Sequence, residues 1–138
     1  MSRTRTAAAA FQPQLDLRSG VPVYRQLIDQ VLTAIASGTL SGGDQLPTVR
    51  QVAVDLAINP NTVMRAYREL EIRNILTTQQ GTGTFITEQK VKASDAQRRR
   101  RLSQMIGELV ARAGAEGFSV EELLEVLRDL QEENKRRQ

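Results

Sequence analysis

Apolar side chains recur at intervals of three and four residues in several stretches of this 138-residue chain. That spacing is typical of a helix with one apolar face. The first such stretch, residues 22–37, begins at Pro22 and ends before Gly38. Proline suits the first position of a helix and glycine its C-terminal end, so we predict a helix there. Before it, residues 15–17 alternate between apolar and polar types, which favours a short strand.

Two further helices are predicted by their start signals. After an expected loop over 40–47, a helix over 48–57 begins with Thr48, and Gln51 follows three residues later, the pattern of a capping box. A third helix over 59–73 begins with an Asn-Pro pair, an N-cap residue followed by proline at the first helical position. Three helices in a row, separated by short breaks, are therefore expected.

A β-hairpin is predicted after the third helix. Two strand-like runs, 75–79 and 84–87, lie on either side of Gly81-Thr82-Gly83, and glycine between such runs is a turn signal. The polar stretch 90–97 then breaks the pattern, and we place the boundary of the first domain there.

Two amphipathic helices are predicted after this boundary, each opened by a capping-box pattern, at Ser94 and Ser119. If the helices form a hairpin, their apolar stripes cover each other only in part, because the stripes are wide. A second copy of the chain would cover the rest, and we predict homodimerisation; the alternative is that the hairpin folds back on the first domain. The stripes consist of Leu102, Met105, Ile106, Leu109 and Val110, and of Leu123, Leu124, Leu127 and Leu130.

The predicted fold is mainly α-helical with a small β-hairpin. We expect a flexible N-terminus over 1–14, a winged helix-turn-helix over 15–90 and a helical hairpin dimerisation tail over 91–138. No apolar run reaches the length of a membrane span.

Composition excludes most catalytic chemistry. The chain has no cysteine and no histidine, which removes disulfides, zinc fingers, thiol nucleophiles and histidine acid–base catalysis. No carboxylates are paired at a catalytic spacing, so we predict no enzyme activity, metal site or cofactor. The net charge of +3 is modest, so an argument for nucleic-acid binding must rest on where the arginines lie.

The third helix separates two kinds of side chain on a helical wheel. One side is apolar and must pack inward, whereas the other is polar and begins near the helix N-terminus. A helix that enters the DNA major groove presents such a face, on which Arg can bind guanine and Asn can bind adenine. The alternative is a solvated face whose arginines pair with Glu69 or Glu71. The polar side carries Asn61, Met64, Arg65 and Arg68.

Two other elements complete this candidate DNA-binding surface. Thr48 and Arg50 lie in the first turn of the second helix, where free backbone amides attract phosphate; the alternative for Thr48 is a cap alone. Gly81, Thr82 and Gly83 allow the hairpin tip to approach a sugar-phosphate edge closely, and the alternative is an ordinary turn.

The segments LPTVRQVAVDLAINPNTVMRAYRELE and ILTTQQGTGTFIT, with VPVYRQLIDQV before them, resemble the winged helix-turn-helix of the GntR family. The likeness covers residues 15–88. The short tail is similar to that of the YtrA-like subfamily. This resemblance implies a homodimeric, autoregulatory repressor that reads an inverted repeat near transporter genes.

The resemblance also implies DNA contacts by Arg50, by Asn61, Thr62 and Arg65, and by Gly81 to Gly83. Other subfamilies have arginine at the positions of Pro60 and Met64, so their base readout does not transfer to this chain.

The sequence thus predicts a sequence-specific regulator of bacterial transcription, located in the cytoplasm and on the nucleoid when bound. Its predicted partners are duplex DNA and a second copy of itself, with no membrane contact and with a small-molecule effector left open. The alternative is a winged-helix protein–protein interaction module without specific DNA binding. The run Arg98–Arg101 is either a solvated helix start or a contact to flanking phosphate.

Overall fold

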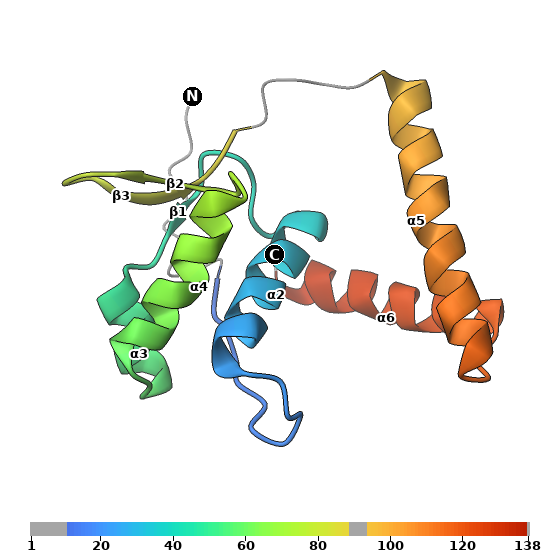
Figure 1. Ribbon diagram of the computed structural model, residues 1–138, viewed down its shortest axis with the longest axis horizontal. Helices are drawn as coiled ribbons and strands as arrows, with labels where there is room; N and C mark the ends of the chain where they lie inside the picture. Colours follow the sequence, from blue (N-terminus) through green and yellow to red (C-terminus); the bar gives the residue numbers. More distant parts are fainter. Residues whose placement is uncertain (1–10, 89–93, 138) are drawn as a thin grey trace. The chain divides into compact units, whose positions relative to one another are not determined.

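The computed structural model describes residues 11–88 and 94–137 of the chain. The chain divides between Glu88 and Gln89 into two compact units, and Figure 1 shows the helices and strands of each. The first unit holds three helices and a small sheet, and the second holds two helices. Within the described residues, no helix is both long and apolar enough to cross a membrane.

The helices of the first unit lie where the apolar spacing predicts them. They are α2 over Val23–Ala36, α3 over Val49–Leu56 and α4 over Pro60–Ile72. Each agrees with its predicted range to within a residue at either end. This agreement is expected, because local signals in the sequence mark both the start and the end of each helix.

Both N-cap side chains accept the predicted hydrogen bonds at the starts of α3 and α4. The capping box predicted at Thr48 is only half formed. The Thr48 hydroxyl accepts a hydrogen bond from the Gln51 amide at 3.1 Å, and the Asn59 side chain accepts one from the Asn61 amide at 2.8 Å. The Gln51 side chain does not return to the cap. It donates to Asp55 at 2.9 Å instead, a carboxylate one turn further along the same helix face.

A three-stranded antiparallel sheet forms the wing and its base. Its strands are β1 over Gln45–Leu46, β2 over Leu76–Gln79 and β3 over Gly83–Ile86, with β3 in the centre. The expected loop over 40–47 was therefore wrong in part, because it contains β1. A two-residue strand has no periodicity to detect, and β1 exists because β3 pairs with it. The register joins Gln45 to Phe85, Leu46 to Thr84 and Leu76 to Ile86.

The core of the first unit lies where α4 packs against α2, α3 and β2. The inward side of α4 is completely covered, which fixes the opposite side as the one exposed to solvent. Each fully buried aliphatic side chain stabilises the fold by roughly 1.5–3 kcal/mol. The largest fully buried side chains are Leu27, Leu40, Leu46, Leu70, Val31, Val52 and Val63.

Residues 11–14 are held against the first unit by a buried side chain and hydrogen bonds, so the expected flexible N-terminus over 1–14 was wrong for these four residues. Phe11 is only 5% exposed and belongs to the core. The Gln30 side chain accepts from the Gln14 amide at 2.8 Å and donates to its carbonyl at 2.6 Å. The short strand expected over 15–17 is absent, because side-chain amides of α2 rather than a neighbouring strand pair with this backbone. Residues 1–10 lie outside the described residues.

The second unit consists of α5 over Asp95–Ala115 and α6 over Val120–Arg137. Both predicted capping boxes are complete, the one at Ser94 and the one at Ser119. The predicted hairpin packing was wrong: the two helices diverge from their connecting turn instead of packing along their lengths (Figure 1). Gly117, with φ of +88°, forms this turn.

Because the tail helices diverge, most of their apolar side chains remain exposed to solvent. Val110 and Leu123 are partly covered. Leu109 is 43% exposed, and the other large apolar residues of the two stripes are exposed to a similar or greater degree. Within the second unit, therefore, neither helix covers the apolar stripe of the other. The exposed members are Leu102, Met105, Ile106, Leu109, Leu124, Leu127 and Leu130.

Candidate nucleic-acid interface

Helix α4 has the two faces that the helical wheel predicts. Its inward side is buried: Val63, Ala66 and Leu70 have no exposed surface, and Tyr67 is 4% exposed. Its outward side begins at the first turn and carries polar, hydrogen-bonding side chains together with one methionine. The exposed residues on this side are Asn61, Met64, Arg65 and Arg68.

This outward side is slightly hollowed. A shallow depression is lined by residues from three successive turns of α4, with polar groups at its N-terminal end and Ile72 at its C-terminal end. Glu69 pairs with Arg73 at 4.0 Å, and among the described residues no acid forms an ion pair with Arg65 or Arg68. The solvated alternative, in which these arginines pair with Glu69 or Glu71, is therefore not supported by the ion pairs of the described residues.

Arg65 is held by an aromatic ring instead. Its guanidinium carbon lies 3.8 Å from the centre of the Tyr24 ring on α2. A cation at this distance over an aromatic face is attracted by the ring's charge distribution. The wheel placed Arg65 correctly on the exposed side of α4, but nothing local to α4 indicates a contact with Tyr24, which lies 41 positions earlier in the chain.

Helix α3 presents its N-terminus at the surface, with Thr48 and Arg50 exposed. The Thr48 hydroxyl is used as the cap, and it retains a lone pair and a donor for a further partner. The Tyr67 hydroxyl donates to the Pro47 carbonyl at 2.7 Å. This bond ties the turn before α3 to α4, so the two helices present their exposed residues as one surface.

The wing tip joins β2 to β3 through Gln80, Gly81 and Thr82. Gly81 has φ of +79° and no atom near the position of a Cβ, so it is an open turn residue. Thr82 donates its amide to the Gln79 carbonyl at 3.0 Å, which closes the turn. Gly81 and Thr82 are both exposed, as a contact to a sugar-phosphate edge requires.

Gly83 has a structural role beside its predicted contact to DNA. It is the first residue of β3, has φ of +137°, and a Cβ there would collide with the Gln45 side chain. Gln45 crosses the wing at this point and donates to the Thr82 carbonyl at 3.1 Å. The glycine therefore leaves room for a supporting side chain from β1, and its contact to DNA stays a prediction. Sequence reasoning missed Gln45 because it missed β1.

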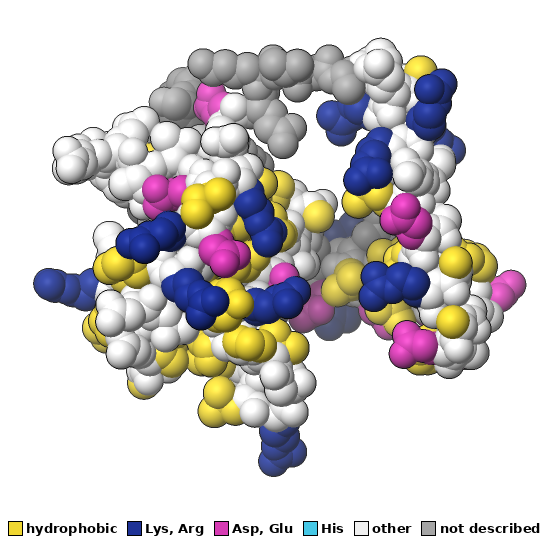
Figure 2. All heavy atoms as spheres, in the orientation of Figure 1, with side chains coloured by type: hydrophobic (Ala, Val, Ile, Leu, Met, Phe, Trp, Pro, Cys, Tyr) yellow, Lys and Arg dark blue, Asp and Glu magenta, His cyan; other side chains and the backbone are white. Residues whose placement is uncertain are grey.

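The charge on this surface is mixed. Figure 2 shows basic side chains spread over the first unit with acidic and apolar groups between them. No continuous basic patch covers the visible face, in keeping with the modest net charge of +3. Recognition of a polyanion by this unit would therefore depend on the positions of a few individual basic side chains and on the backbone amides at helix N-termini.

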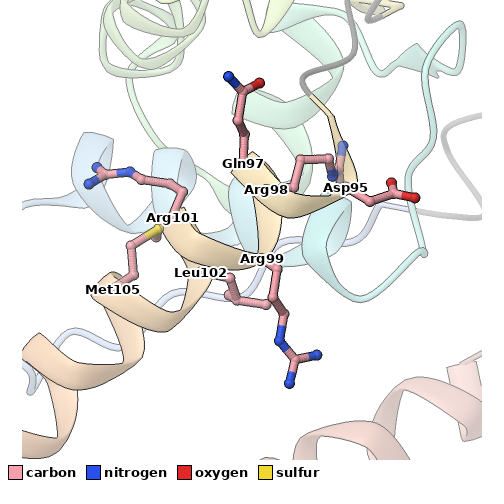
Figure 3. Close-up of a pocket in the computed structure, with 7 residues that line it drawn as sticks. All are labelled: Asp95, Gln97, Arg98, Arg99, Arg101, Leu102 and Met105. Atoms are coloured by element: carbon pink, nitrogen blue, oxygen red, sulfur yellow. The ribbon is translucent and has the colours of Figure 1, made fainter.

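A second group of arginines begins α5. Figure 3 shows Arg98, Arg99 and Arg101 extending in three different directions around the helix, next to Leu102 and Met105. Arg101 donates to Gln104 at 3.4 Å. Side chains that bind one anion converge on it, whereas these diverge. Their arrangement favours the solvated helix start over a built phosphate site.

Comparison with known proteins agrees with this geometry. Residues 23–86 match the family described as "Bacterial regulatory proteins, gntR family". The transcriptional repressor YtrA of Bacillus subtilis is 34% identical over 117 residues, which is 85% of this chain and 90% of YtrA.

Two solved structures from Listeria monocytogenes share the architecture. A GntR family transcriptional regulator superposes with a TM-score of 0.58 at 30% identity, over 82% of this chain and 98% of that one. A protein described as a transcriptional antiterminator superposes with a TM-score of 0.66 at 26% identity, over 88% and 94% of the two chains.

Proposed function

This chain belongs to the GntR family of bacterial regulatory proteins, and from this premise we propose that it represses transcription as a homodimer bound to an inverted-repeat operator. Membership makes it a DNA-binding transcription regulator. Repression is supported by its likeness to YtrA, which carries the name of a repressor. The proposal places the protein in the bacterial cytoplasm, where its operator lies, and gives it no catalytic role.

The observation that carries the proposal is the exposed polar face at the N-terminal end of α4. Asn61, Arg65 and Arg68 are there, solvent-exposed and directed away from the core. We propose that this end of α4 enters the major groove and that these side chains contact base edges. Thr62, partly buried in the first turn, supports the same contact.

The flanking elements are proposed to contact the backbone. Thr48 and Arg50 at the start of α3 would bind a phosphate, since amides at a helix N-terminus attract anions. Gly81 and Thr82 would approach the sugar-phosphate edge from the wing. Gly83 contributes to the wing by admitting Gln45. Backbone contacts of this kind fix the register of the protein on the duplex, and base contacts then give specificity.

The dimer is proposed because one such surface reads only one half-site, and because the tail leaves two apolar stripes uncovered. Burial of about six of these side chains per chain would contribute on the order of 10 kcal/mol before the cost of association. A symmetric dimer places two recognition helices in register on a duplex, and an inverted repeat has the same symmetry.

Selection of bound duplexes from random DNA tests the proposal. We expect an inverted repeat, and a set of recovered duplexes with no shared motif would contradict sequence-specific recognition. On the selected operator, Arg65→Ala should weaken binding by about 1–3 kcal/mol. Arg73→Ala, at the far end of the same helix, is the matched control and should leave operator affinity nearly unchanged. Equal affinity of Arg65→Ala and the natural protein would remove Arg65 from the contact surface.

A further inference from the structure

The stacked pair of Arg65 and Tyr24 joins the recognition helix to a helix outside the helix-turn-helix. Tyr24 lies in the first turn of α2, is half-buried, and packs against the core. Its ring is therefore held in place by the residues around it. Arg65, on α4, is exposed to solvent. The guanidinium carbon of Arg65 lies 3.8 Å from the centre of this ring. At that distance the ring of Tyr24 restricts the orientations that the Arg65 side chain can adopt.

The contact leaves the hydrogen-bonding groups of Arg65 available. A guanidinium that stacks on a ring uses its flat face, and its five N–H donors all lie in its plane. Those donors remain free to bind a base edge or a phosphate. Tyr24 is thus able to orient Arg65 without competing for the groups that would contact DNA.

Among the described residues, no acid forms an ion pair with Arg65. The depression on α4 around it is lined by Asn61 and Met64 before Arg65, and by Arg68, Glu69 and Ile72 after it. Glu69 is engaged by Arg73. The ring of Tyr24 is accordingly the group that the structure provides to fix the direction of this side chain.

We propose that Tyr24 is a positioning residue for sequence recognition: it holds Arg65 in the orientation from which Arg65 contacts the operator. An arginine ordered before binding loses less conformational freedom on binding, and its planar donors then match one base edge better than others. This inference rests on the proposed function, because it requires that Arg65 contacts DNA. It extends the specificity-determining residues from α4 to α2.

A double-mutant cycle on the 138-residue chain tests the inference. Operator Kd is measured for Tyr24→Leu, Arg65→Ala and the double variant, and Tyr24→Phe is the matched control because it keeps the aromatic face. Each is also measured on a duplex with a scrambled operator. We expect Tyr24→Leu to weaken operator binding by roughly tenfold, with little change on the scrambled duplex. Tyr24→Phe should stay within about twofold of the natural protein.

The decisive comparison is the effect of Tyr24→Leu when Arg65 is already alanine. We expect no further loss there, since the ring has nothing left to orient. An equal loss in both backgrounds would mean that Tyr24 acts through packing, and would overturn the inference. Tighter operator binding by Tyr24→Leu would also overturn it, because the ring would then be holding Arg65 away from the DNA.

Thermal melting of each variant shows whether the fold is retained. If Tyr24→Leu does not fold, Tyr24→Met replaces it in the same cycle, because methionine adapts to irregular core space. An Arg65→Ala protein with unchanged operator affinity would remove the role proposed for Arg65, and the role of Tyr24 with it. A loss for Arg65→Ala that is merely additive with Tyr24→Leu would remove the role of Tyr24 alone.

Discussion

Tyr67 connects the interior of the first unit to its candidate DNA-binding surface. Its ring is buried on the inward side of α4, and its hydroxyl donates to the Pro47 carbonyl directly before the cap of α3. One side chain therefore fills the core and also fixes the turn between β1 and α3. Desolvation raises the pKa of the Tyr67 phenol well above its usual value.

Tyr67→Phe should reduce the free energy of unfolding by about 1 kcal/mol near neutral pH, because the hydrogen bond to Pro47 is lost while the ring still fills its site. Urea denaturation measures this change. Tyr24→Phe, which alters the half-buried tyrosine, serves as the control. No measurable loss of stability would mean that water replaces the hydroxyl at the Pro47 carbonyl.

The Tyr67 phenol also makes the free energy of unfolding fall at alkaline pH. Since burial raises the pKa of Tyr67, the unfolded chain loses this proton above pH of about 10 while the folded chain still holds it. The contribution of the protonated Tyr67 phenol to the free energy of unfolding is therefore complete below pH of about 10. It is lost as the pH rises beyond this value toward the raised pKa of the folded state. In Tyr67→Phe the fall in stability above this pH should be shallower, and an unchanged slope would contradict the assignment.

At the scale of elements, two glutamines of α2 hold the N-terminal segment in place. Gln26 and Gln30 lie one turn apart, and each side-chain amide bonds both the N–H and the carbonyl of one residue in the segment. Gln26 binds Asp16 and Gln30 binds Gln14, two residues apart. The two side chains thus replace a neighbouring strand, and they bring Phe11 into the core.

Gln30→Ala should release this segment, because it removes both bonds to Gln14. We expect faster hydrogen exchange at the Gln14 amide and a loss of about 1–2 kcal/mol of stability. Gln51→Ala is the matched control: that exposed side chain donates one bond to Asp55. Unchanged exchange at Gln14 would mean that Phe11 alone anchors the segment.

Local sequence signals predicted most of the elements, because caps and apolar spacing act within a few residues. Thr48 and Asn59 mark the starts of α3 and α4 in the sequence and in the structure. The errors concern features that depend on distant partners. β1 exists through its pairing with β3, and Phe11 is ordered because α2 offers it a site. The contact of Gln45 with Gly83 likewise depends on the pairing of β1 with β3.

At the scale of the whole molecule, the proposed role of the tail is to hold two DNA-binding surfaces together in a dimer. The stripes of α5 and α6 remain largely exposed because the two helices diverge from their turn. This divergence strengthens the case for a second copy, since each helix lacks the intramolecular cover that a hairpin would supply. We therefore place the proposed dimer contact along both stripes.

Leu109→Asp should separate the dimer, because it would bury an unpaired charge in the stripe of α5. We expect the dimer dissociation constant to rise by about a hundredfold or more, as measured by analytical ultracentrifugation, and operator affinity to fall with it. Gln104→Asp, an exposed change on the opposite side of α5, is the matched control and should remain dimeric. A Leu109→Asp protein that is still dimeric at low concentration would rule out this surface.

The order of helices, the position of the hairpin and the polar side of α4 follow from the amino-acid sequence alone. Each depends on interactions between residues a few positions apart, which apolar spacing and capping signals record directly. Tertiary structure was needed for β1, for the placement of Phe11, for the divergence of the tail helices and for the Tyr24–Arg65 contact. These join residues far apart in the chain, and only the folded backbone decides which distant side chains meet.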